Sequence, residues 1–144
     1  MNQDHYSKLE RMYAGAPINK FFQPRLTIGE GRAELRLAVR PDFFHAANAA
    51  HGSVYFKAMD DAAFFAANSL VEDVFVLTSG FTLHLLRPIA SGEMIATASV
   101  VSKTRSLIVA DAVVHDGAGV QLARGTGTFM RSKTPLTEEI GYRL

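Results

Sequence analysis

Hydrophobic residues occupy every second position between Ala33 and Val39. This period of two is typical of a strand with one buried face. Apolar residues at positions 26 and 28 predict a partner strand before it, and the glycines within residues 29–31 supply the turn between the two strands. The alternation breaks over residues 41–50, which we interpret as a loop.

Residues 53–70 predict a long helix. Their apolar side chains surround the whole circumference, and such a helix is buried on most of its sides. Ser53 is suited to cap its first turn. Nearer the N-terminus, residues 4–14 predict a shorter helix with Met12 and Tyr13 on one face.

Every element after the long helix is predicted to be a strand. The four strands are residues 74–86, 94–101, 107–114 and 120–130. Short connections between them favour antiparallel pairing. One apolar helix wrapped by one curved antiparallel sheet is an α+β architecture, known as the hotdog fold. We expect a single domain over residues 1–144, with a helix and connector in residues 1–20, a connector extending through residues 19–23, and a polar tail at residues 132–144.

Composition narrows the possible functions. The 15 Lys and Arg residues nearly balance the 14 Asp and Glu residues, for a net charge of +1, so we expect no nucleic-acid partner. The absence of cysteine excludes disulfides, zinc–thiolate sites and a cysteine nucleophile. His45 and His51 do not have metal-ligand spacing, so no metal is expected. A polar N-terminus and the lack of a long apolar run predict a cytoplasmic protein without membrane association.

Two adjacent carboxylates, Asp60 and Asp61, stand in the middle of the most apolar helix. Burying an ionised carboxylate is unfavourable unless it is paired or hydrogen-bonded. Successive helical positions differ by about 100°, so the two side chains cannot share one environment. One or both can pair with Lys57, which lies three and four residues earlier. The other interpretation is that one carboxylate carries chemistry.

His51, Gly52 and Ser53 come just before this helix. The first N–H groups of a helix have no intrahelical acceptor and carry the positive end of the helix dipole. Since Gly52 has no side chain, a substrate oxygen can approach its N–H closely, as in an oxyanion hole. The alternative interpretation is an ordinary cap and turn.

The run from His51-Gly52-Ser53 to Asp60 resembles the H-G-G…D segment of hotdog thioesterases of the phenylacetate-degradation (PaaI) type. Further along, Leu85-Leu86-Arg87-Pro88 is similar to that family's F-L-R-P turn, and Ser91-Gly92-Glu93 to its x-G-D turn. The likeness extends over about residues 10–131, and its strength lies in the order and spacing of these motifs.

The resemblance implies hydrolysis of acyl-CoA thioesters by a homodimer or a homotetramer built as a dimer of dimers, with the active sites at the dimer interface. One subunit would supply the loop of His51 and Gly52, and the other would supply the helix carboxylate. Gly52 N–H would polarise the thioester carbonyl, and Asp60 would be the general base or the nucleophile. Thr78 would help to hold the water or the carboxylate.

This sequence departs from the family pattern at two positions. Ser53 replaces the second glycine of the motif, and His45 stands where the family usually has an asparagine that contacts the thioester carbonyl. Histidine also donates a hydrogen bond, so His45 remains a candidate catalytic residue, and Asn48 lies nearby as a possible substitute.

Further residues are candidates for substrate binding. Ser53, Asn48 and Asp61 are expected near the thioester, and Arg87 and Arg105 are candidates for the CoA phosphates. Coenzyme A would enter only as part of the substrate, and no separate cofactor is expected. Candidates for the acyl pocket, each of which can equally be a core residue, are Tyr55, Phe56, Phe64, Phe65 and Phe81.

Three hypotheses follow. The leading one is an acyl-CoA thioesterase. The second is a non-catalytic binder of acyl-CoA or another thioester, suggested by the unusual His45. The third is a hotdog dehydratase acting on hydroxyacyl or enoyl thioesters, for which we find no matching arrangement of histidine and carboxylate.

Overall fold

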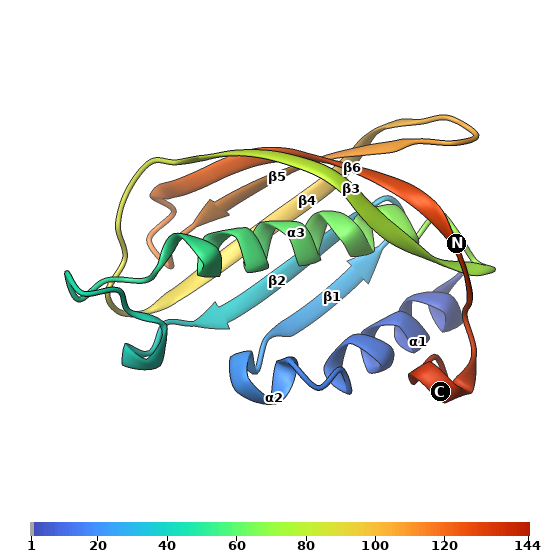
Figure 1. Ribbon diagram of the computed structural model, residues 1–144, viewed down its shortest axis with the longest axis horizontal. Coiled ribbons are helices and arrows are strands. Elements are labelled where there is room, and N and C mark those ends of the chain that lie inside the picture. Colours follow the sequence, from blue (N-terminus) through green and yellow to red (C-terminus); the bar gives the residue numbers. More distant parts are fainter. Residues whose placement is uncertain (1) are drawn as a thin grey trace.

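A computed structural model describes residues 2–144 and shows one curved sheet wrapped around one long helix (Figure 1). The helices are α1 (Gln3–Ala14), α2 (Asn19–Phe22) and α3 (Gly52–Asn68), with short 3-10 helices η1 (Pro41–Phe43) and η2 (Glu138–Ile140). The strands are β1 (Arg25–Gly29), β2 (Arg32–Ala38), β3 (Val74–Leu85), β4 (Glu93–Lys103), β5 (Ile108–His115) and β6 (Gln121–Pro135).

All strand pairs are antiparallel, and the order across the sheet is β1-β2-β4-β5-β6-β3. Strand β3, the first after α3, therefore crosses to the far side of the sheet and pairs with the last strand. In this position β3 is an edge strand, and its outer edge has no strand partner within residues 2–144.

Helix α3 fills the concave side of the sheet. Alanines at its buried positions, such as Ala58, Ala62 and Ala66, are inaccessible to solvent, and their small side chains let the helix approach β2, β4 and β5 closely. One stripe of the helix stays accessible, and it includes Phe56 and Asp60. The prediction of an α+β hotdog fold is confirmed. Within residues 2–144 no helix is both long enough and apolar enough to cross a membrane.

Three local predictions were wrong or incomplete. Residues 19–22, interpreted as a connector, form the helix α2, because Ile18 and Asn19 continue the helical hydrogen bonding begun at Ala16. Helix α3 begins at Gly52 and is capped by His51 rather than by Ser53. The tail expected over residues 132–144 begins within β6, which continues to Pro135, and it also contains the η2 turn.

That tail closes against α1. Buried His5 contacts the Tyr142 hydroxyl at 2.7 Å through Nδ1 and the carbonyl oxygen of Asn68, the last residue of α3, at 2.9 Å through Nε2. The N-terminal helix, the C-terminal tail and the end of α3 are thereby joined at one point, which fixes α1 beside the central helix (Figure 1).

Candidate active site

The Asp60 side chain extends from α3 toward the edge strand β3. Its Oδ1 accepts a hydrogen bond of 2.8 Å from the Thr78 hydroxyl. Its Oδ2 accepts none from residues 2–144, so this oxygen is free to take a proton from water. The chain thus brings together Asp60 and Thr78, two of the predicted catalytic residues.

Aromatic pairs flank this hydrogen bond on both sides. One helical turn before Asp60, the ring of Phe56 meets Phe81 of β3 edge-on, with 5.4 Å between centroids. One turn after it, Phe64 meets Phe75 at 5.0 Å. The carboxylate therefore stands between two apolar contacts of the same helix and strand.

A β-bulge makes this arrangement possible. Residues on one face of a strand normally alternate, so Thr78 and Phe81, three positions apart, would point to opposite faces. The pairing of β3 with β6 shifts register between Thr78 and Gly80, and the extra residue, Ser79, restores both side chains to the α3 side.

The surroundings raise the proton affinity of Asp60. Burial raises its pKa to about 6, against an ordinary value of 3.8, and the neighbouring charge of Asp61 acts in the same direction. The Thr78 hydrogen bond and the positive charge of Lys57 oppose the rise. A carboxylate with this pKa is a better base near neutrality than one in water, and it is still mainly ionised at pH 7.

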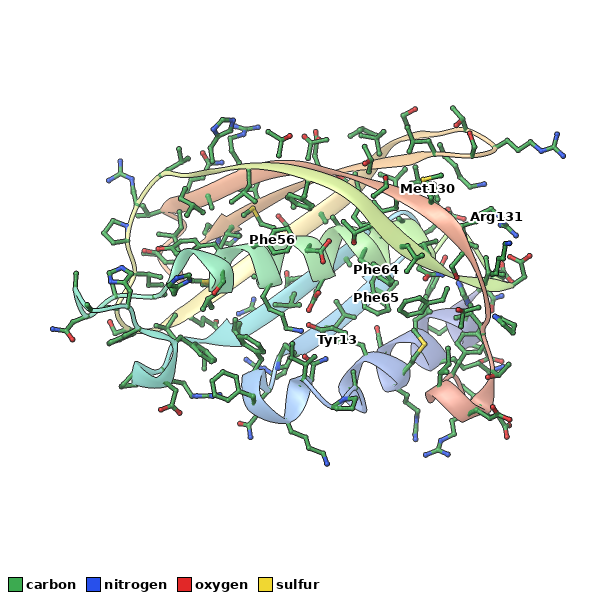
Figure 2. The ribbon with its side chains drawn as sticks, viewed as in Figure 1. Tyr13, Phe56, Phe64, Phe65, Met130 and Arg131 are labelled. Atoms are coloured by element: carbon green, nitrogen blue, oxygen red, sulfur yellow. The ribbon has the colours of Figure 1, made fainter. Side chains whose placement is uncertain are left out.

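Asp61 has a different set of contacts. Its Oδ2 forms an ion pair of 2.7 Å with Lys57 Nζ, the pairing considered from the sequence, and accepts a hydrogen bond of 2.5 Å from the Tyr13 hydroxyl. Tyr13 comes from α1 and packs edge-on against Phe65, so it lies between the two helices (Figure 2). Asp61 thus points toward α1 and Asp60 points toward β3.

The start of α3 presents a free backbone donor. His51 Nδ1 accepts from Ser53 N–H at 3.0 Å, and Val54 N–H donates to the His51 carbonyl at 2.9 Å. Within residues 2–144 the Gly52 N–H donates to no acceptor. A Cβ at Gly52 would come within 3.0 Å of Leu85 Cδ1, so glycine lets Leu85 pack closely against the start of α3.

His45 and Asn48 lie in the loop that leads to Gly52. His45 Nδ1 accepts from Ala47 N–H at 3.0 Å, and the Asn48 N–H donates to the His45 carbonyl in a turn where Asn48 has a φ of 65°. The loop is anchored by the His51 N–H, which donates to the Phe43 carbonyl. His45 and Asn48 are therefore near the N-terminal end of α3, and neither lines the cleft that contains Asp60.

The two candidate arginines lie far apart in the fold. The Arg87 carbonyl accepts from the Tyr55 hydroxyl of the first turn of α3, so Arg87 is beside the same helix end as Gly52. Arg105 is in the β4–β5 hairpin, in a separate hollow with Lys103 and Arg131. Their roles in binding the CoA phosphates stay predictions.

A cleft of about 1010 Å³ runs along α3 between α1, β3 and the C-terminal tail. Asp60, Asp61 and Thr78 line it, as do Phe64 and Phe65 from the predicted aromatic set. The cleft is also lined by four residues that were not predicted from the sequence to lie at the site: Tyr13, Asn19, Phe75 and Leu77. For Tyr13 a signal existed, because it lies on the apolar face of the predicted N-terminal helix.

The family follows from comparison with known proteins. Residues 47–123 match the model of the thioesterase superfamily, and these residues are more than half of the chain and include α3 and β3. The chain belongs to the thioesterase superfamily. The resemblance drawn from the sequence is thus confirmed, together with the expectation of a family of thioester hydrolases.

Individual relatives agree with this. The PaaI protein from the phenylacetic acid degradation operon of E. coli superposes with a TM-score of 0.84 at 23% identity, covering 93% of this chain and 97% of its own, and this likeness concerns the fold. A thioesterase family protein of Silicibacter pomeroyi gives a TM-score of 0.80 at 29% identity, with coverages of 88% and 96%.

Among curated sequences, a proposed esterase of Saccharolobus solfataricus is 29% identical over 80 residues, which are 56% of this chain. The match spans 53% of that protein, so the chain covers about half the length of this curated relative.

Proposed function

We propose that this protein hydrolyses acyl-CoA thioesters, with Asp60 as the residue that activates the attack and Gly52 N–H as the oxyanion donor. The observation that carries the proposal is the ionisable carboxylate of Asp60, hydrogen-bonded to Thr78 and flanked by two aromatic pairs. A carboxylate in such surroundings is disfavoured for stability, and its presence is explained if it does chemistry.

The distance between the two groups implies a second copy of the chain. Asp60 follows Gly52 by eight residues on one helix, a rise of about 12 Å. The donor and the base must both lie within about 3 Å of the reacting groups, so one chain cannot supply both. If two α3 helices lie antiparallel across a two-fold axis, Gly52 of one copy comes beside Asp60 of the other.

The exposed surface supports such a pairing. The outer edge of β3 is unpaired within residues 2–144, and three large apolar side chains on or beside it are accessible: Phe56 at 37%, Leu77 at 52% and Leu85 at 49%. A homodimer, or a tetramer made of two such dimers, would cover this surface and remove water from Asp60.

The reaction follows from the charges involved. Asp60 Oδ2 takes a proton from water as the water oxygen bonds to the thioester carbon. The negative charge that develops on the carbonyl oxygen is stabilised by Gly52 N–H, an interaction that contributes about 3 kcal/mol in comparable sites. The C–S bond then breaks, and the CoA thiolate takes the proton back from Asp60 as it leaves, giving a free acid, CoA and the ionised Asp60.

Asp60 can also act as the nucleophile and form a mixed anhydride that water then cleaves. A single turnover in H₂¹⁸O identifies the nucleophile route when water cleaves the anhydride at the Asp60 carbon, because only that path places ¹⁸O in the Asp60 carboxyl group. Mass spectrometry of the peptide that contains Asp60 reads the result.

The function itself is tested by thiol release from a panel of short, long and aromatic acyl-CoAs. We expect turnover of at least one member and its loss in Asp60→Asn with the thermal unfolding transition intact. A panel with no thiol release above the background rate contradicts the proposal, and stabilisation by acyl-CoAs without turnover would identify a non-catalytic binder.

A further inference from the structure

Asp61, the second carboxylate of α3, lies in a cluster that the reaction proposed above does not use. The cluster consists of Lys57, Asp61, Tyr13 and Asn19. Lys57 Nζ contacts Asp61 Oδ2 at 2.7 Å and donates to Asn19 Oδ1 at 2.8 Å. Asn19 in turn donates to the Tyr13 carbonyl at 2.7 Å, and the Tyr13 hydroxyl returns to Asp61.

The cluster is largely withdrawn from solvent. The Lys57 and Asp61 side chains are 12% and 17% exposed, and Asn19 is 5% exposed. The Lys57 ammonium also lies over the rings of Tyr13 and Phe22, at 5.3 and 5.1 Å. Side chains from three helices therefore contact a single ammonium group, which holds Asp61 on the α1 side through their ion pair.

Stability alone explains such a cluster poorly. The desolvation of a buried ion pair offsets much of its Coulomb attraction, and a well-packed apolar pair often stabilises a fold as well. Burial raises the pKa of the Tyr13 hydroxyl above its ordinary value, and the charge of Asp61 adds to the rise. The hydroxyl therefore keeps its proton and remains a hydrogen-bond donor. The arrangement is suited to holding a charge in one place.

The charge it holds is next to Asp60. The two carboxylates differ in their partners: Asp61 has a cation and a phenol, and Asp60 has one hydroxyl group and no cation within 4 Å among residues 2–144. Helical geometry turns Asp61 about 100° away from Asp60, and the contacts with Lys57 and Tyr13 hold its carboxylate at the α1 side of the cleft that both aspartates line.

We propose that the cluster of Lys57, Asp61 and Tyr13 is a positioning device for Asp60. It fixes the second carboxylate on the α1 side, so that Asp60 alone meets the substrate, and keeps a negative charge beside Asp60 that makes it a stronger base. This inference rests on the proposed function. It also makes α1, which precedes the residues matched by the family model, a part of the active site.

The charges of the cluster act on Asp60 in opposite directions, which makes the proposal testable. The charge of Asp61 raises the pKa of Asp60 and that of Lys57 lowers it. Asp61→Asn should therefore lower the titration midpoint of Asp60, and Lys57→Met should raise it. Other groups that face the same cleft are Tyr13, Arg11, Glu138, Glu139 and Arg143.

The measurement is the ¹³C chemical shift of the Asp60 carboxyl group against pH, assigned by its loss in Asp60→Asn. It needs no turnover, so it separates a failure of this inference from a failure of the proposed function. Lys57→Met leaves Asp61 without its cation and can destabilise the fold. The double variant Lys57→Met/Asp61→Asn removes both charges and leaves no unpaired carboxylate at position 61. Its Asp60 titration midpoint is expected to lie between those of the two single variants.

Controls distinguish positioning from simple structural support. Lys57→Arg keeps the charge and should restore the wild-type midpoint. Asp111→Asn removes a carboxylate on the other face of the sheet and should leave it unchanged. With an acyl-CoA that the protein hydrolyses, the acid limb of kcat/KM should move with the NMR midpoint. Equal midpoints in the wild type, Asp61→Asn and Lys57→Met, or shifts of the same sign in both variants, would overturn the proposal.

Discussion

Two threonine–aspartate hydrogen bonds in this molecule have the same chemistry and different surroundings. Thr78 donates to Asp60 at 2.8 Å on the inner side of the sheet, and Thr126 donates to Asp111 at 2.7 Å on its outer side. Asp111 is exposed on β5, whose alternate residues are buried. Asp60 is flanked by aromatic rings, and burial raises its pKa to about 6. The difference shows that the surroundings, rather than the hydrogen-bond partner, set Asp60 apart.

The largest expected effect is on catalysis, and it distinguishes the Thr78–Asp60 pair from the Thr126–Asp111 pair. Asp60→Asn should lower kcat for acyl-CoA hydrolysis by about 10²–10⁴-fold, as is typical for loss of a general base. Asp111→Asn makes the same chemical change beside the same kind of partner and should stay within about twofold of the wild type. Thiol-release assays on both variants provide the measurement, and equal losses would remove the distinction.

Gly52→Pro tests the oxyanion donor without removing a side chain. Proline is well tolerated at the first position of a helix, and His51, with φ −62° and ψ 148°, already has the backbone conformation that precedes proline. Loss of the N–H should lower kcat by about 10²–10³-fold. Gly52→Ala keeps the N–H and needs only a small movement of Leu85, so it should retain most of the activity.

Gly127→Ala tests the aromatic wall beside Asp60. A Cβ there would come within 2.7 Å of Phe81 and 2.8 Å of Phe129, which forces the rings to shift and should destabilise the fold by about 1–3 kcal/mol. Gly117→Ala, in a turn with no atom within 4 Å of the new Cβ, should be nearly neutral. Urea unfolding of both variants compares them, and a neutral Gly127→Ala would show that Phe81 has room to move.

Asp60→Asn should also change stability. Because burial raises the pKa of Asp60, the folded state holds its proton more tightly than the unfolded chain does, and stability falls as pH rises from about 4 to 6. Above pH 6 the wild type carries this penalty and the amide does not, so Asp60→Asn should be more stable by about 1–3 kcal/mol at pH 7. The gain should vanish near pH 3.5, and a pH-independent difference would indicate another cause.

The sequence predicted the helix and the strands well, because their hydrophobic periods differ. The two carboxylates in an apolar helix identified the site, and the ion pair of Asp61 with Lys57 followed from helical spacing. The strand order could not be predicted, because the pairing of β3 with β6 is a contact between residues far apart in the chain.

Two parts of the site also depended on such contacts. The bulge at Ser79 is what lets Thr78 and Phe81 face the same helix, and an alternating pattern contains no sign of it. Tyr13 contacts Asp61, 48 positions further along the chain. The sequence therefore predicted only that Tyr13 lies on the apolar face of a helix, and not that it contacts the site. His51 acts as the cap because its ring nitrogen reaches Ser53 N–H, a geometry that a preference for serine at caps did not anticipate.

The pH dependence of kcat/KM for a hydrolysed acyl-CoA tests the central claim most directly, since it reports the ionisation of the essential base in the free enzyme. We predict an acid limb with a midpoint at about pH 6 or higher, because burial within one chain raises the pKa of Asp60 to about 6 and a dimer partner would exclude further water. A limb near pH 4, the value expected for a carboxylate in water, or activity independent of pH between 4 and 8, would contradict the account.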